Sequence, residues 1–268
     1  ALADALRKRP VTGSLGISHT RWATHGLPSD ANAHPHLDES GRLVIVHNGI
    51  IENYAELRRR LVERGHHFLS QTDTEVLAHL IGHHLDKLVP RGKRPAPELL
   101  TQAVQRATQE AEGTYAIAVL HADMPDQLIG ARRGSPLVVG VGKGEQFLAS
   151  DVSPIVNHTR KVIYLYDGDV VRLTRDQVEL FARGKPIKRA VSTIHWSAEE
   201  AEMGRFPHYM LKEIHEQPKR VADLLKLTLR PRDGIVEFVG RALKRKALAQ
   251  IQRLVLVACG TSWHAALA

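Results

Sequence analysis

The feature that most limits the fold is a run of short strand-like segments in the middle of the chain. Between Tyr115 and Phe181, hydrophobic segments of four to six residues recur every 8–12 residues, with turn residues such as Asp167-Gly168 between them. This spacing leaves no room for a helix between strands, so it predicts antiparallel pairing. The expected strands are 115–120, 127–132, 137–141, 146–149, 162–166, 170–173 and 178–181.

Helix-like segments lie before and among these strands. We expect helices at 52–64, from 71 onward and at 99–111, because apolar residues recur there at helical spacing. Thr72 or Asp73 is the expected cap of the second helix. Two histidines four residues apart on it, His79 and His83, are expected at the surface. The sequence therefore predicts an α+β fold, with layered antiparallel sheets that helices cover.

The stretch from Leu43 to Asn53 joins a predicted strand to a predicted helix. Four branched apolar residues, 43–46, are typical of a buried strand, and Asn48-Gly49 then reads as a strand-to-helix turn. Taken alone, Asn-Gly is most often an ordinary turn, because both residues tolerate positive φ. The alternative is an oxyanion hole, in which the two amides donate to a developing negative charge.

Polar residues gather ahead of this stretch. We expect a strand at 15–19, a polar loop at 19–26 and an irregular segment at 27–36. His34 and His36 form a His-x-His pair, but no further ligands follow at metal-site spacing, so a metal site is not predicted. A short strand is expected at 68–70.

Composition excludes several classes of protein. No apolar run approaches the roughly 20 residues of a membrane span, and residues 1–10 do not resemble a secretory signal. The single cysteine, Cys259, excludes an internal disulfide and fits a reducing cytosol. The formal charge of +8 arises mainly between Lys219 and Arg253. A nucleic-acid patch is conceivable there, but a solvated linker and helix surface is the favoured interpretation, and a nearby phosphorylated substrate is a third.

The pattern changes after about Arg189. A helix is expected at 208–217, stopping at Pro218, and an apolar strand at 254–258 leads into a Gly-Thr-Ser loop. A strand followed by a loop and the N-terminus of a helix is an arrangement that binds phosphate. We therefore expect three regions: one domain at 1–190, an interdomain linker with helices at 191–250, and the start of an α/β domain at 251–268.

Five separated motifs resemble those of class II (N-terminal-nucleophile) glutamine amidotransferases. Among these, the chain is most similar to the glutamine–fructose-6-phosphate aminotransferases. The motifs are 19–26, 32–36, 47–53, 72–76 and 212–218, and the loop 258–262 resembles the opening sugar-phosphate loop of that family's isomerase (SIS) domain. The resemblance implies an αββα glutaminase domain at 1–190.

The resemblance also implies a role for individual residues. Arg21 would bind the α-carboxylate of free glutamine and Asp73 its α-ammonium, while Thr24 and His25 would line the same pocket. Asn48 and Gly49 would form the oxyanion hole.

Further roles in the resemblance concern the second substrate. Trp22 would gate an ammonia channel, and Thr261 and Ser262 would bind the sugar phosphate. The implied substrates are L-glutamine and fructose 6-phosphate, which would give glucosamine 6-phosphate and glutamate. The intact protein is expected to be a cytoplasmic homodimer with no cofactor, metal, nucleic acid or membrane partner.

One departure from the family is large. The family's nucleophile is an N-terminal cysteine, whereas residue 1 here is Ala1 and no cysteine precedes Cys259. We therefore expect the chain to be truncated at both ends and inactive as it stands. The alternatives are a class II amidotransferase with a different acceptor, and a glutamine-binding protein without catalysis.

Overall fold

The computed structural model describes residues 2–21, 26–90, 92–195, 204, 206–230, 235–236, 250–253, 255–257 and 267. The chain divides into two compact units, Ala1–Ala201 and Glu202–Ala268. The domain boundaries expected at residues 190 and 250 stay predictions.

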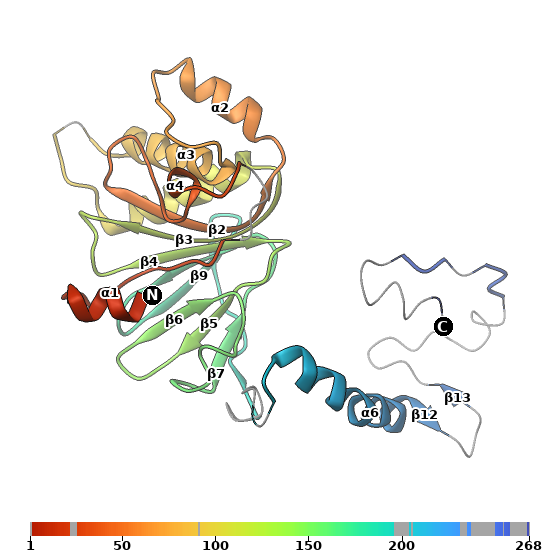
Figure 1. Cartoon of the computed structure of the whole chain (residues 1–268). Helices are drawn as coiled ribbons and strands as arrows, with labels where there is room; N and C mark the ends of the chain where they lie inside the picture. Colours follow the sequence, from red (N-terminus) through yellow and green to blue (C-terminus); the bar gives the residue numbers. More distant parts are fainter. Residues whose placement is uncertain are drawn as a thin grey trace. The chain divides into compact units, whose positions relative to one another are not determined.

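The first unit contains helices and two antiparallel sheets (Figure 1). Its helices are α1 (Leu2–Lys8), α2 (Tyr54–Val62), α3 (Asp73–Leu88), α4 (Pro97–Glu110) and a 3-10 turn at Asp30–Asn32. Its strands are β1 (His36–Leu37), β2 (Leu43–Ile51), β3 (Gly113–His121), β4 (Leu128–Arg133), β5 (Val138–Val141), β6 (Gln146–Ala149), β7 (Lys161–Tyr164), β8 (Asp169–Leu173), β9 (Val178–Ala182), β10 (Lys185–Ile187) and β11 (Ser192–Thr193). All seven strands expected at 115–181 are therefore present, and β10 and β11 are additional.

The strands form a seven-stranded sheet, β1-β2-β3-β4-β8-β9-β10, and a four-stranded sheet, β11-β7-β5-β6. Every pairing is antiparallel, and the longest one joins β2 to β3 from Leu43–His121 to Ile51–Gly113. Helices α3 and α4 cover one face of the large sheet in Figure 1, and β5–β7 lie on its other side. The predicted α+β class with layered antiparallel sheets is confirmed.

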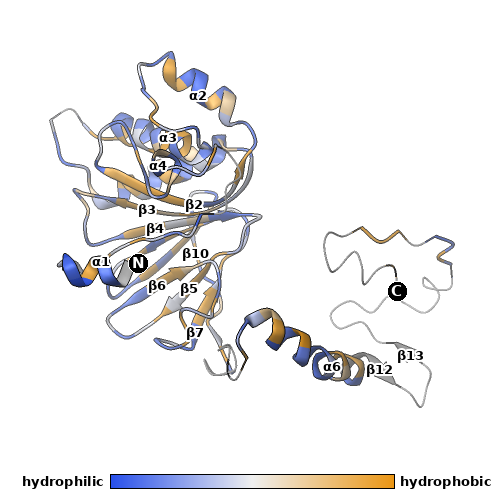
Figure 2. Cartoon of the chain, viewed as in Figure 1, coloured by the Kyte–Doolittle hydropathy of each residue, from blue (hydrophilic) through white to orange (hydrophobic). Residues whose placement is uncertain are grey.

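Successive side chains along a strand point to opposite faces of the sheet, so the hydrophobic core is divided into layers on either side of the large sheet. On β3, Ile117 and Val119 join the cluster that packs against the helices, whereas Ala116 packs with the second sheet. Figure 2 shows mostly hydrophobic residues on the strands and alternating kinds along α2. The outer face of the second sheet is covered by Ile155 and Val156 of the turn segment 151–158.

Helix α3 is the most buried helix of this unit. Its apolar stripe, Val76, Leu77, Leu80 and Ile81, is at most 1% exposed. Burying each large side chain of this kind contributes about 2 kcal/mol. The helix packs against α2, α4 and β2, so its N-terminus is held at the large sheet.

The two sheets approach closely at Gly130 on β4. A Cβ atom there would lie 2.7 Å from Cδ2 of Leu148 on β6 and 2.9 Å from Cγ1 of Val171. Leu148 therefore fills the space that a side chain at 130 would need. The absence of a side chain sets the local distance between the layers.

Two predicted strands are wrong. Residues 15–19 form no strand; they line a cavity between the sheets instead. Residues 68–70 are also irregular, because the backbone N–H groups of Leu69 and Ser70 donate to the Glu75 carboxylate, each at 2.7 Å. Those bonds replace the ladder that a strand would make.

The predicted turn at Asn48-Gly49 is also wrong. Both residues lie within β2, paired with Ala116 and Tyr115 of β3. Gly49 has φ +138°, and a Cβ there would lie 2.1 Å from the carbonyl oxygen of Thr114. Glycine is therefore required for close approach of two strands, and the chain turns only after Ile51.

The second unit contains helix α6 (Tyr209–Thr228) and a small hairpin, β12 (Leu229–Arg230) with β13 (Ile235–Val236). The predicted stop at Pro218 is wrong, since α6 continues through it. Glu216 forms ion pairs with Lys212 at 3.7 Å and Arg220 at 3.8 Å, one turn to either side. Such pairs support the helix across the proline. Of the strand expected at 254–258, the structure describes residues 255–257, and these three form no strand, so the prediction is wrong there.

Among the described helices, none combines the length and apolar character that crossing a bilayer requires.

We predict that Gly49→Ala destabilises the protein by about 3–5 kcal/mol, since it adds both left-handed strain and a steric overlap. Gly41→Ala is the matched control, because Gly41 has φ +65° but nothing within 4 Å of a Cβ. It should cost about 1–2 kcal/mol. Urea unfolding of both variants measures the difference. Equal losses would contradict the close contact at Thr114.

Candidate functional site

A cavity of about 260 Å³ lies where the C-terminal part of β2 meets the start of α3. It brings together four residues that the sequence assigned to one site: Arg21, Asn48, Gly49 and Asp73. The other lining residues are His19, His34, His47, Ile50, Thr72, Thr74 and Thr114. The remaining predicted site residues, Trp22, Thr24, His25, Thr261 and Ser262, lie outside the described residues, as does Cys259.

Asp73 is the buried carboxylate of this cavity. Thr72 is the N-cap of α3, since its side chain accepts from the backbone N–H of Glu75, and Asp73 is thus the first helical residue. The Asp73 Oδ2 atom accepts a hydrogen bond from the backbone N–H of Ile51 at 2.8 Å. This bond fixes the carboxylate between helix and sheet. Within the described part of the chain, Oδ1 has no hydrogen-bond partner.

Arg21 places a guanidinium at the wall of the same cavity. Its Nη2 donates to the carbonyl oxygen of Gly26 at 3.1 Å, and its Nη1 to that of Leu27 at 3.4 Å. A guanidinium has five N–H donors in a planar fork, so these bonds are compatible with binding a carboxylate. The two hydrogen bonds orient the guanidinium of Arg21 relative to the backbone at Gly26 and Leu27.

Asn32 connects this loop to the start of α3. Its Nδ2 donates to the Leu27 carbonyl oxygen at 2.9 Å, and its Oδ1 accepts from the backbone N–H of Gln71 at 2.9 Å. Asn32 is 4% exposed, so both bonds are shielded from water. The side chain that holds the Arg21 loop thereby also holds the residues that precede Asp73.

Asn48 is oriented by His19. The Nε2 atom of His19 lies 2.7 Å from Oδ1 of Asn48. If the amide oxygen accepts from this ring, the Asn48 NH₂ group faces elsewhere as a donor. An amide donor beside the backbone of Gly49 is the arrangement that stabilises an oxyanion.

Two threonines of the α3 N-terminus bind histidines at the cavity. The Thr74 hydroxyl lies 3.0 Å from His34 Nε2 and 3.1 Å from His47 Nδ1. The Thr72 hydroxyl lies 3.1 Å from His36 Nε2. These contacts connect β1 and β2 to the helix N-terminus through side chains alone.

The pKa of His34 is lowered from 6.5 to about 3, first by burial and then by the neighbouring charges of His19, His36, His47 and Arg21. Burial also lowers the pKa of His36. The His34 ring is therefore neutral near pH 7. A neutral His34 ring avoids repulsion with the nearby Arg21 guanidinium.

Several of these residues escaped the sequence-based assignment. His19, Asn32, His34, His47 and Thr74 had no expected role, although all five lie inside the recognised motifs. For His19, Asn32 and His34, the available signal was the density of polar side chains at 19–36. Their partners are distant in sequence, as with Asn32 and Gln71, which are 39 residues apart.

The arrangement suits a small zwitterion. A guanidinium can bind a carboxylate, a buried carboxylate can bind an ammonium, and amide N–H groups can stabilise negative charge on an oxygen.

A family model described as a glutamine amidotransferase domain matches residues 19–157. That span is more than half of the chain and contains all the described cavity residues. The chain belongs to the glutamine amidotransferase domain family.

Full-length relatives of this amidotransferase chain come from several organisms. A glutamine–fructose-6-phosphate aminotransferase (isomerizing) of Thermus thermophilus is 49% identical over 100% of this chain and 42% of its own length. The protein of the same name from Gloeobacter violaceus is 48% identical over 96% of this chain and 40% of its own length. The chain thus spans about two fifths of these relatives.

Among solved structures, glutamine phosphoribosylpyrophosphate amidotransferase from B. subtilis, complexed with ADP and GMP, is similar with a TM-score of 0.47. Its identity is 23%, over 61% of this chain and 34% of that chain.

The depressed pKa of His34 predicts a pH dependence of stability. The unfolded chain takes up a proton near pH 6.5, whereas the folded chain resists it to about pH 3. Unfolding is therefore favoured as pH falls through this window, and the contribution of His34 to stability is present in full above pH 6.5. We expect the unfolding free energy to fall between pH 7 and pH 4, and to fall less steeply in His34→Gln. An identical slope in the variant would contradict a buried neutral ring.

Proposed function

We propose that the full-length protein hydrolyses L-glutamine and transfers the ammonia to fructose 6-phosphate, giving glucosamine 6-phosphate and glutamate. The observation that carries the proposal is the cavity in which Arg21, Asp73, Asn48 and Gly49 meet. The acceptor is inferred from the relatives named glutamine–fructose-6-phosphate aminotransferase, at 43–49% identity.

Glutamine is held by its two charged ends in this proposal. Arg21 binds the α-carboxylate and Asp73 the α-ammonium, so the side-chain amide extends toward Asn48. An ammonium on Asp73 adds to the bond from Ile51 N–H without replacing it, because a carboxylate has two acceptor oxygens. A protein-bound glutamine lacks both free ends, which makes the site selective for the free amino acid.

Asn48 and Gly49 act on the reacting amide. When a nucleophile attacks the carbonyl carbon, negative charge develops on its oxygen, and amide donors there lower the barrier. The nucleophile that the class uses is a cysteine thiol. The printed sequence has one cysteine, Cys259, which we assign to the sugar-phosphate loop with Thr261 and Ser262, and not to the glutamine site.

Further assignments complete the proposal. Thr24 and His25 line the glutamine pocket, and Trp22 gates the passage of ammonia. The protein is a cytoplasmic homodimer that needs no cofactor.

Glutamine affinity tests the two charged contacts. Arg21→Lys in the full-length protein should raise the glutamine KM by about tenfold or more, because a point charge does not reproduce the planar fork. Asp73→Asn should raise it as well, since the ammonium loses its counter-charge. The assay follows glutamate and glucosamine 6-phosphate from the two substrates. If the unsubstituted protein produced glutamate without glucosamine 6-phosphate, the proposed acceptor would be wrong, whereas the proposed glutamine site would not be contradicted.

The oxyanion hole is tested through kcat. Asn48→Ala should lower kcat by about a hundredfold, with a smaller change in KM. His19→Ala should act in the same direction through Asn48, and His19→Gln should restore part of kcat, because its amide can still donate to Oδ1. If these variants changed only KM, Asn48 and His19 would be glutamine-binding groups and not charge-stabilising ones.

A further inference from the structure

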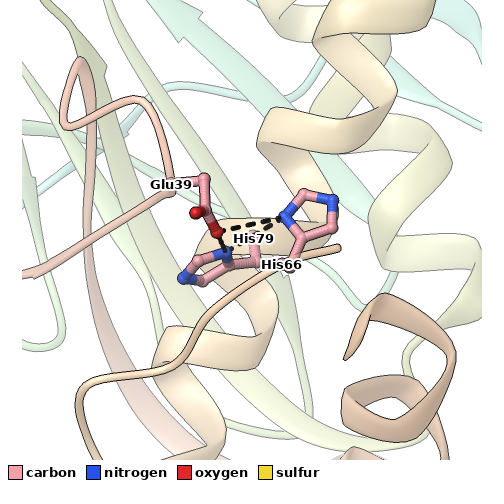
Figure 3. A group of neighbouring side chains, drawn as sticks. All are labelled: Glu39, His66 and His79. Atoms are coloured by element: carbon pink, nitrogen blue, oxygen red, sulfur yellow. Dashed lines mark hydrogen bonds and ion pairs between the residues drawn. The ribbon is translucent and has the colours of Figure 1, made fainter. Parts of the chain in front are cut away.

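Outside the glutamine cavity, a glutamate and two histidines converge on one point (Figure 3). Glu39 lies in the turn between β1 and β2, His66 follows α2, and His79 is on α3. The two histidine Nδ1 atoms are 3.2 Å apart. Glu39 Oε2 lies 3.8 Å from Nδ1 of His66 and 3.7 Å from Nδ1 of His79.

These separations are those of ligands around a small metal ion. Zinc binds imidazole nitrogen at about 2.0–2.1 Å, and tetrahedral geometry then places neighbouring ligand atoms about 3.4 Å apart. The three observed distances lie on either side of this value, so only small shifts are needed. We propose that Glu39, His66 and His79 bind a divalent transition-metal ion of the zinc class.

Groups behind the ligands hold them in place. Nε2 of His79, the nitrogen turned away from the site, lies 3.8 Å from Oε1 of Glu75. The Glu75 carboxylate is itself fixed by hydrogen bonds from Leu69 and Ser70. A carboxylate behind a histidine ligand sets its tautomer and raises its basicity.

Glu39 is fixed in a similar way. Its Oε2 accepts from the backbone N–H of His67 at 2.7 Å, and its Oε1 lies 3.1 Å from the His67 ring. These bonds hold the carboxylate beside His66 and His79, although Glu39 is the most exposed of the three ligands.

Metal binding would reverse a chain of hydrogen bonds. Nη1 of Arg64 lies 3.2 Å from Nε2 of His83, and Nδ1 of His83 lies 3.4 Å from Nε2 of His66. Because Arg64 only donates, this chain places a proton on Nδ1 of His66. A bound metal needs that lone pair, so the proton must move to Nε2 and the Arg64 contact is lost.

The donor set selects the class of ion. Two imidazoles and one carboxylate suit zinc, cobalt or nickel better than magnesium or calcium, which prefer oxygen ligands. Three protein ligands leave a fourth position for water. A cavity of about 570 Å³, lined in part by Glu39, Glu75 and His79, gives the ion access.

The ion would connect three segments that are separate in sequence. The segment carrying His66 continues through Ser70 to Asp73, and Glu75 touches both the His79 ring and this segment. Metal binding would therefore stiffen the backbone that leads into the glutamine cavity. This role is independent of the acceptor and of the nucleophile.

Titration of the tag-free protein with Co²⁺ and Zn²⁺ tests the proposal. We expect one Co²⁺ per chain, with the intense visible absorption of a tetrahedral site, and displacement of Co²⁺ by Zn²⁺. Glu39→Gln and His66→Gln should each weaken binding by about tenfold or more. Both side chains are partly exposed, so these variants are expected to fold. Arg64→Ala should tighten binding several-fold, since it removes the competing donor and a positive charge.

Two control variants separate this site from other histidines. His158→Gln, on the turn over the second sheet, and His34→Gln, in the glutamine cavity, should leave the Co²⁺ affinity and spectrum unchanged. Loss of binding in His34→Gln with retention in His66→Gln would place the ion in the glutamine cavity and overturn the proposal. The absence of stoichiometric binding by the parent protein would also overturn it.

Discussion

The N-terminus of α3, docked against β2, is the contact on which the site depends. Its central bond is the one from Ile51 N–H to the Asp73 carboxylate. Thr72 caps the helix, and the Thr74 hydroxyl contacts the rings of two histidines. The Glu75 carboxylate accepts a hydrogen bond from the backbone N–H of Ser70. Four consecutive polar residues are thus buried, each with partners, which offsets the cost of removing them from water. Displacing this helix end would separate Asp73 from Asn48 and Gly49.

Charge in the glutamine cavity is kept low by burial. Burial and neighbouring positive charge keep His34 neutral, so Arg21 has few nearby cations to repel it. Glu75 shows the opposite balance. Burial would raise its pKa, but hydrogen bonds from His79, Ser70 and Leu69 outweigh this and lower it to about 2. The ionised Glu75 carboxylate and the neutral His34 ring beside the same helix end show that burial and hydrogen bonding together determine which groups stay ionised.

Sequence patterns predicted which helices and strands are present better than they predicted where each one begins and ends. The strands at 115–181 were predictable, because short hydrophobic segments recur there every 8–12 residues with turn residues between them. Gly49 was misassigned, since Asn-Gly is a frequent turn and the contact with Thr114 depends on a residue 65 positions away in the printed numbering. His79 was expected at the surface but is 2% exposed, because α3 is covered on more than one side.

The site residues were predicted on a different basis from the helices and strands. Arg21, Asn48, Gly49 and Asp73 were assigned by resemblance to a family, and periodicity alone would not have grouped them. The structure brings these four together in one cavity. The supporting contacts of His19 and Asn32, and the convergence of Glu39 with two histidines, require the three-dimensional fold. Each joins residues whose separation in sequence carries no local signal.

Contact between the sheets at Gly130 links the evolution of two positions. Leu148 occupies the space above this glycine, so the two residues share one volume. An alanine at 130 would need space from Leu148 across the layers and from Val171 in the same sheet, so a smaller residue at 148 would remove the overlap between the sheets, and each change alone would leave an overlap or a void there. Across related sequences, the sizes of these two side chains should therefore vary inversely, which makes them a marker for how far apart the two sheets stand in each relative.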